Sequence, residues 1–135
     1  MNPLIEKKLL QGAVAVACLV PLGFGASGVV LGTEMFGGAN EDVDNQFRYL
    51  SGVLFGIGLL FVSVIPKIEN NGERMRLLVA LVVIGGLGRL LGSFISGVMD
   101  GKIIFALAME LAVAPLLYLW QCRIRKKDAL NDRAA

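Results

Sequence analysis

Two side chains of opposite charge stand inside the longest apolar stretches of this sequence. Arg89 lies within LLVALVVIGGLGRLLGSFISGV, and Glu110 lies within IIFALAMELAVAPLLYL. A charged side chain costs roughly 3 kcal/mol to insert at the centre of a membrane helix, so such residues normally face a partner inside the protein. An arginine and a glutamate in this setting predict an ion pair between two helices.

The depth of this pair follows from counting along a helical hairpin. We predict a tight turn centred on Asp100 and Gly101, between two apolar helices. Arg89 lies about eleven residues before the turn and Glu110 about ten after it, so at about 1.5 Å per residue both lie roughly 15 Å from it. The two side chains are therefore expected at the same level, in the outer half of a membrane.

Further polar residues belong to the same predicted site. Arg48 opens another apolar stretch from the same outer side, Asp44 precedes it by one helical turn, and Ser93 follows Arg89 by one turn. A cluster of Arg48, Arg89 and Glu110 would carry a surplus positive charge, which suits an anionic, strongly polar or lipid-like ligand. The structural alternative is that the Arg–Glu pair only fixes the register of two helices.

The elements that position these residues are predicted from composition. The chain is 56% apolar with a mean hydropathy of +0.70, and four stretches approach the roughly 20 apolar residues that a membrane helix needs. They are residues 9–32, 47–66, 77–98 and 103–121. A helix facing water keeps a continuous polar stripe, and these stretches have none. We predict an all-α membrane protein, a four-transmembrane-helix bundle forming one domain over 1–135, with a basic tail at 122–135.

The basic residues predict the orientation of this bundle. Most of the 13 lysines and arginines fall on one side of four crossings, near the first span, in the connection between the second and third, and after the fourth. The opposite side carries the acidic loop TEMFGGANEDVDNQ. The positive-inside rule then places both termini in the cytoplasm of a multi-pass protein of the bacterial inner membrane. Alternatively, 1–32 is a signal peptide, but its apolar run is about twice the usual length.

Glycines at helical spacing predict close packing between helices. Gly52 and Gly56 share one helix face, and Gly85, Gly88 and Gly92 are spaced along another helix. Small residues let membrane helices approach closely. We expect these glycines to pack within the bundle, with homo-oligomerisation through the same faces as the alternative.

The sequence predicts neither catalysis nor a cofactor. It contains no histidine, and no phosphate-binding loop or CxxC motif is present, so no catalytic residue, metal ligand or cofactor is assigned. Cys18 and Cys122 lie at different predicted depths, which disfavours a disulfide. The basic segment RIRKK next to a span is typical of contact with anionic lipid rather than with nucleic acid.

The order of motifs resembles a known family. The segments DNQFRYLSGVLFGIGLL, IPKIE, MRLLVALVVIGGLGRLLGS and ALAMELAVAPLLYLW are similar to small bacterial membrane proteins grouped as domain-of-unknown-function family 4345, over nearly the whole chain. The resemblance implies four helices and three motifs, a Phe-Arg element, a Gly-Gly-x-x-Arg element and a glutamate before a proline. They are matched by Phe47–Arg48, by Gly85, Gly86 and Arg89, and by Glu110 with Pro115. The family name implies no activity.

These observations lead to a hypothesis about function. We expect a non-enzymatic module in the lipid bilayer that binds a small-molecule or lipid-like ligand at the Arg/Glu cluster. Two alternatives are an accessory subunit that docks onto a larger membrane complex or a second copy, and a small proton-coupled exporter. In the exporter, Glu110 would have to separate from Arg89 before it could titrate near neutral pH.

Overall fold

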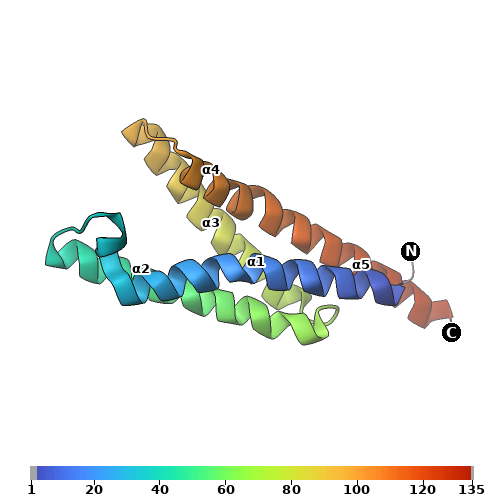
Figure 1. The fold of residues 1–135 in the computed structure, drawn as a ribbon. Coiled ribbons are helices and arrows are strands. Elements are labelled where there is room, and N and C mark those ends of the chain that lie inside the picture. The colour runs from blue at the N-terminus through green and yellow to red at the C-terminus, as the bar shows by residue number, and fades with distance from the viewer. Residues whose placement is uncertain (1–2, 135) are drawn as a thin grey trace. The chain divides into compact units, whose positions relative to one another are not determined.

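The computed structural model describes residues 3–134, and every regular element in this range is helical (Figure 1). In chain order the elements are α1 (Pro3–Leu31), the 3-10 helix η1 (Gly32–Phe36), α2 (Glu41–Val64), the 3-10 turn η2 (Ile65–Lys67), α3 (Gly72–Ser96), α4 (Gly101–Ala108), the π-helical turn η3 (Met109–Val113) and α5 (Ala114–Ala134).

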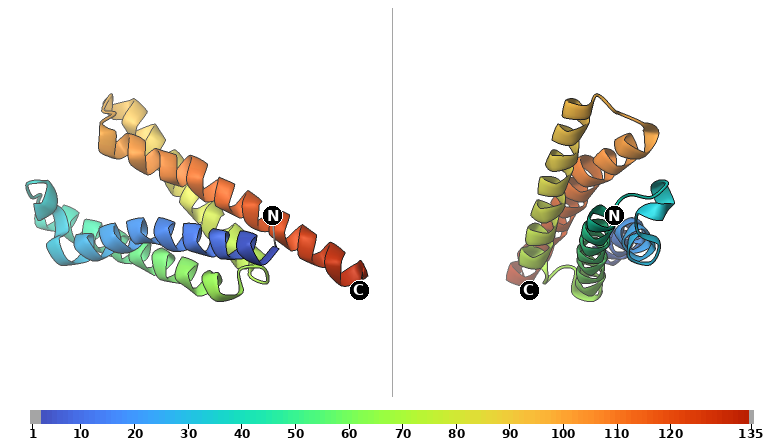
Figure 2. Two further views of the ribbon diagram at one scale, coloured as in Figure 1. Left: turned by 45° about the vertical axis from the view of Figure 1, so that its right-hand side comes forward. Right: turned by 90° about the vertical axis from the view of Figure 1, so that its left-hand side faces the viewer.

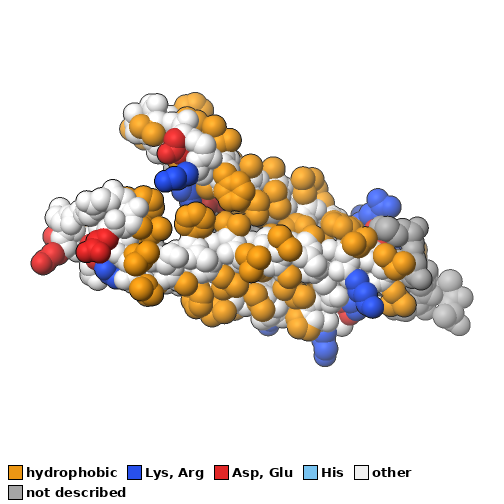
Figure 3. Space-filling model, in the orientation of Figure 1, with side chains coloured by type: hydrophobic (Ala, Val, Ile, Leu, Met, Phe, Trp, Pro, Cys, Tyr) orange, Lys and Arg blue, Asp and Glu red, His pale blue; other side chains and the backbone are white. Residues whose placement is uncertain are grey.

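Four helical stretches are long and apolar enough to cross a membrane. They are Leu4–Phe36, Glu41–Lys67, Gly72–Ser96 and Gly101–Lys127. Large apolar side chains lie exposed along them, as expected of helices that face lipid, and hydrophobic side chains are distributed along the visible helix surface in Figure 3. This is the composition of a multi-pass membrane protein.

The helices extend beyond the apolar stretches that predict them. The predicted spans 47–66 and 77–98 begin several residues after α2 and α3 begin, because polar residues form the first turns of these helices, and they run slightly past the ends of the two helices. The basic segment expected to be a tail, 122–135, is helical through Ala134 as a continuation of α5. Lysine, arginine, alanine and leucine are good helix formers, which accounts for this extension.

The described chain divides into two compact units. One comprises the described residues of Met1–Ala13 and Pro66–Ala135, and the other comprises Val14–Ile65. Helix α1 contributes to both. The single four-span domain predicted from the sequence remains a prediction.

In the first unit, α3 packs against the continuous helix formed by α4, η3 and α5 (Figure 2). The two helical arms of this hairpin run in opposite directions. Buried side chains from α1, the η2–α3 connection, α3 and α5 include Leu10, Ile68, Met75, Leu78 and Ile124. The Gln121 Nε2 also donates a hydrogen bond of 2.5 Å to the Ile68 carbonyl, which fastens the connection to α5.

The turn of this hairpin lies earlier than predicted. Helix α3 ends at Ser96, and its C-cap Gly97 has a φ of +69°, a left-handed conformation that favours glycine. Asp100 is the N-cap of α4, because its side chain accepts a 2.9 Å hydrogen bond from the Ile103 amide. The turn is therefore centred before Asp100 rather than on Asp100 and Gly101.

In the second unit, α1 and α2 form a helical pair, lying side by side in Figures 1 and 2. The approach is close at several glycines, including Gly25 and Gly58. A Cβ atom at Gly25 would lie 2.7 Å from the Phe55 backbone nitrogen, and one at Gly58 would lie 2.9 Å from the Leu22 side chain. Only glycine at these positions leaves room for the partner helix.

Candidate functional site

The Arg89 and Glu110 side chains form a two-pronged ion pair within the first unit. Arg89 Nε donates to Glu110 Oε2 at 3.0 Å, and Arg89 Nη2 donates to Glu110 Oε1, also at 3.0 Å. Parallel N–H···O bonds of this kind orient both side chains as well as attracting them. The pair links α3 to η3, the two elements that the hairpin count sets at matching depth.

The backbone around the pair is arranged for close approach. Gly86 lies one turn before Arg89 on α3, and a Cβ atom there would lie 2.9 Å from the Glu110 Cβ and 2.8 Å from the Leu111 side chain. A larger residue would push η3 away from α3. Gly86 belongs to the Gly-Gly-x-x-Arg element, and its role in the structure is to admit the glutamate-bearing turn.

Glu110 lies in a π-helical turn. In η3 the Ala114 amide donates to the Met109 carbonyl, five residues back instead of four. Pro115 follows at once, has no amide hydrogen, and its ring crowds the carbonyl four residues earlier in an ordinary α-helix. The wider turn relieves that crowding. Single π turns inside α-helices are frequent at functional sites.

The ion pair is accessible, which corrects the expectation of a buried salt bridge. The Arg89 side chain is 44% exposed and that of Glu110 is 20% exposed. Ser93, one turn beyond Arg89 on α3, is by contrast buried. The pair thus lies at the surface of the first unit, at a level where the sequence predicts apolar surroundings.

Arg48 and Asp44 have a different role, in the second unit. The Arg48 Nε donates to Asp44 Oδ2 at 2.6 Å, while its Nη1 donates to the carbonyls of Val29 and Val30 at 2.7 and 2.9 Å. These carbonyls belong to the last turn of α1, where a helix leaves such groups without partners. The guanidinium therefore caps α1.

Asp44 completes this cap from the other side. Its Oδ1 accepts hydrogen bonds from the amide and the hydroxyl of Thr33, at 2.6 and 2.8 Å. Between them lies Gly32, with a φ of +61°, where a Cβ atom would collide with the Asp44 carboxylate and the Arg48 guanidinium. The connection from α1 to α2 is thus built around a structural Asp–Arg pair.

A cavity of about 410 Å³ opens beside this pair. Its walls include one arginine and three acidic residues, together with small and amide side chains; the lining residues are Thr33, Glu34, Gly38, Ala39, Glu41, Asp44, Asn45 and Arg48. The net charge of this lining is negative, so an anionic ligand is disfavoured here. Acidic residues of the predicted acidic loop do surround Arg48. They neutralise its charge and do not form an anion-binding site.

The structure therefore brings the predicted site residues together in two groups. Asp44 joins Arg48 in the second unit, and Arg89 joins Glu110 in the first, with Ser93 nearby on α3. A single cluster of Arg48, Arg89 and Glu110 stays a prediction.

Four of the five predicted packing glycines do not pack within their own unit. Apart from the adjoining backbone of its own helix, no described atom of the same unit lies within 4 Å of a Cβ placed at Gly56, Gly85, Gly88 or Gly92. Gly52 makes only an ordinary contact, 3.8 Å from the Val29 side chain. The close approaches occur at other glycines, because helix rotation about its axis decides which face meets the neighbour, and spacing alone does not specify that rotation.

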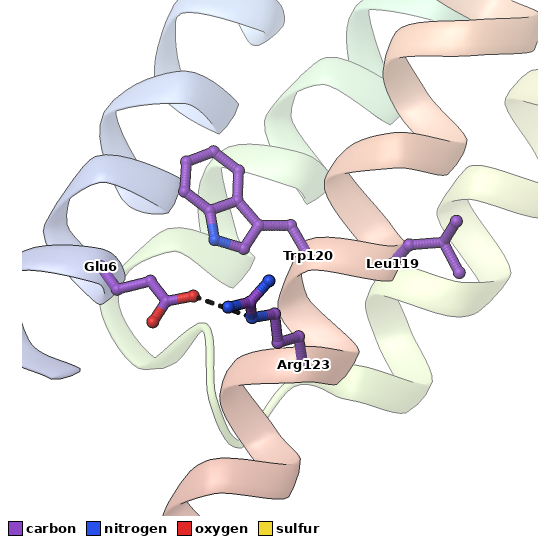
Figure 4. A pocket seen from close by; sticks show the side chains of 4 residues that line it. All are labelled: Glu6, Leu119, Trp120 and Arg123. Carbon is purple, nitrogen blue, oxygen red and sulfur yellow. Dashed lines mark ion pairs between the residues drawn. The ribbon is translucent and has the colours of Figure 1, made fainter. Parts of the chain in front are cut away.

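Sequence reasoning missed a third charged group, centred on Glu6. Its side chain is only 3% exposed, and its carboxylate accepts from Lys127 Nζ at 2.6 Å and lies 3.5 Å from Arg123 Nε. The Trp120 side chain lies beside this group. Figure 4 shows Glu6, Trp120 and Arg123 close together beside a cavity of about 480 Å³. The sequence did contain a signal for this group, because Glu6 is the one acidic residue beside Lys7 and Lys8 at the start of the first span.

No group of three or more metal-ligating side chains capable of holding a metal ion was found among residues 3–134. The charged side chains discussed above therefore form ion pairs and helix caps, in or beside the apolar helices.

The comparisons with known proteins identify a family. Residues 9–121 match the family described as a domain of unknown function, DUF4345. No curated protein and no solved structure matched the chain. The matched range includes the Arg89–Glu110 pair, the Asp44–Arg48 cap and all four apolar helices, in whole or in large part. The chain belongs to the DUF4345 family.

Proposed function

We propose that this protein is a non-enzymatic membrane module that binds a small polar, anionic or lipid-like ligand at the Arg89–Glu110 pair. Its place is the bacterial inner membrane, with both termini in the cytoplasm and the pair in the outer half of the bilayer. The basic residues near the termini support this orientation. The Glu6–Lys127 ion pair supports it too, since it holds the first turns of α1 beside the last turns of α5.

The observation that carries the proposal is the accessibility of an ion pair within apolar helices. A guanidinium that is 44% exposed at this depth would face hydrocarbon if nothing covered it. Exposing a charged group to lipid is costly, and such groups normally line a cavity or meet a polar partner. A bound polar group would satisfy Arg89 at its open edge.

The hydrogen-bond geometry of Arg89 leaves donors for such a partner. Glu110 receives the Nε and one Nη2 hydrogen, and no hydrogen bond of Nη1 is found within residues 3–134. A guanidinium has five N–H donors in a planar fork that matches carboxylate and phosphate groups. Arg89 can thus hold Glu110 on one edge and an anionic or strongly polar group on another.

Native mass spectrometry of the full chain, purified in a mild detergent with the polar lipids of its host, tests the proposal. We expect the wild-type protein to retain a bound small molecule. The double variant Arg89→Leu/Glu110→Leu should lose that added mass. The matched control Glu73→Gln/Arg76→Gln removes an exposed ion pair of the same composition, in which Glu73 is 76% and Arg76 58% exposed, and should keep the added mass. Equal retention by both double variants would refute the site.

The outward-facing glycines support a second candidate, an accessory subunit that docks onto another membrane protein or a second copy. Gly85, Gly88 and Gly92 on α3 have no neighbour in their own unit, and small residues are the usual contact between membrane helices. The same spectra separate the two functions. A dimer or a co-purifying protein without a small-molecule mass would favour docking.

A further inference from the structure

The charged side chains around Glu6 have a net positive charge. Glu6 is 3% exposed and contributes one negative charge, while Arg123 and Lys127 contribute two positive charges. Lys127 makes the short contact of 2.6 Å with this carboxylate. The carboxylate is therefore satisfied largely without Arg123, whose Nε lies 3.5 Å away.

Arg123 consequently presents an unused guanidinium edge. Its side chain is 70% exposed, and no hydrogen bond of its Nη1 or Nη2 is found within the described part of the chain. Exposed Lys8 lies close along the sequence to Glu6 and adds to the positive potential. The edge is oriented by Glu6 on one side and free on the other, which is suitable for binding an anion.

The surroundings of Arg123 are amphipathic. Trp120 and Leu119 line the cavity of about 480 Å³ together with Glu6 and Arg123 (Figure 4). One and two turns before Arg123 on α5, Leu119 and Leu116 are 61% and 63% exposed. Tryptophan is enriched where membrane helices pass from hydrocarbon to headgroups. A cation, an indole and exposed leucines follow one another along α5 in the order in which a phospholipid presents its phosphate, glycerol and acyl chains.

We propose that the Glu6–Trp120–Arg123 cavity binds an anionic phospholipid in the leaflet on the side where the two termini emerge. The phosphate lies on the free Nη1 and Nη2 groups of Arg123, and an acyl chain runs along Leu119 and Leu116. Glu6 holds the guanidinium in place without contacting the lipid. This site is separate from Arg89 and does not depend on the function proposed for that pair.

The chain's single tryptophan makes the site directly observable. Trp120 is the only tryptophan in the sequence, so intrinsic fluorescence reports on this cavity alone. The full chain is reconstituted in phosphatidylcholine vesicles with a small fraction of either dibrominated phosphatidylglycerol or dibrominated phosphatidylcholine. Bromine quenches tryptophan on contact, so preferential occupancy shows as stronger quenching by the anionic lipid at equal mole fraction.

We expect the apparent affinity for the brominated anionic lipid to exceed that for the zwitterionic lipid. In Arg123→Gln this preference should fall about fivefold, the factor that one basic residue near an anionic headgroup typically contributes. Arg123→Lys should retain most of it. The control Lys126→Gln removes the same charge from an exposed neighbour on α5 and should change it little.

Three results would overturn the proposal. Equal quenching of the wild-type protein by the two brominated lipids would show that no anionic preference exists. An equal loss in Lys126→Gln and Arg123→Gln would show diffuse attraction rather than a site. Relief of quenching by millimolar inorganic phosphate would show that the site takes a soluble anion. The wild-type comparison decides the first point even if Arg123→Gln fails to fold.

Discussion

At the scale of single residues, the two arginines near the apolar helices are used in opposite ways. Arg48 donates to Asp44 and to two backbone carbonyls of α1, so its donors are largely occupied by the fold. Arg89 donates only to Glu110 among the described residues, and it keeps an open edge. The first arginine therefore stabilises a connection, and the second is the better candidate for a ligand.

The Arg89–Glu110 pair makes a prediction about stability. Glu110→Ala should destabilise the protein more than the double change Arg89→Leu/Glu110→Leu, because the single change leaves an unpaired charge among apolar helices. The difference should approach about 3 kcal/mol, the typical cost of a lone charge at the centre of a membrane helix. Unfolding in mixed detergent micelles, followed by circular dichroism, measures the free energy of each variant.

The exposed pair Glu73–Arg76 provides the reference for this comparison. Breaking it by Glu73→Ala should cost well under about 1 kcal/mol, as is usual for surface ion pairs. If Glu110→Ala and the double leucine variant lose the same stability, Arg89 and Glu110 do not act as partners.

At the scale of elements, the short connection between η2 and α3 links two helices of the first unit. The segment between η2 and α3 is fastened to α5 through Gln121 and to α1 through the Lys7–Glu69 ion pair, at 2.8 Å. Burial raises the pKa of the Glu69 carboxyl, but the hydrogen bond from the Lys7 ammonium and the positive charges nearby outweigh it, so the pKa lies below its ordinary value of 4.5.

This lowered pKa predicts how stability depends on pH. A carboxyl with a lower pKa in the folded state binds its proton less readily than in the unfolded state. Its contribution is fully present above pH 4.5 and is lost as the pH falls through the lowered value. Chemical unfolding of wild type and Lys7→Gln between about pH 3 and pH 7 should show a shallower acid loss in the variant. The control Lys8→Gln should keep the wild-type slope; if it flattens equally, the effect is general charge and not the pair.

At the scale of the whole molecule, charge distribution predicts the orientation in the membrane. In a background with Cys18→Ser and Cys122→Ser, a cysteine at Ala39 should react with a membrane-impermeant maleimide in intact cells. A cysteine at Asn70 should react only after the membrane is permeabilised. These two positions lie in the acidic connection and in the basic connection respectively, so the reverse labelling pattern would place the termini outside.

The sequence by itself determined the helical class, the four apolar helices and the family. The length and apolar composition of a segment are properties of that segment alone, so they predict a long helix without knowledge of the residues that pack against it. The pairing of Arg89 with Glu110 at one level also follows from the sequence alone, because the number of residues from the turn of an antiparallel hairpin gives the depth of each residue. The turn lies slightly earlier than predicted, but the two side chains still meet.

Only the tertiary structure decided which side chains meet across helices. Each residue turns about 100° around a helix axis, so contact between faces depends on a rotation that spacing leaves open. This is why Gly25, Gly58 and Gly86 lie at close approaches while Gly56 and Gly88 do not. It is also why Glu6 went unnoticed: its partners Arg123 and Lys127 lie at the far end of the chain, and only folding brings them to it.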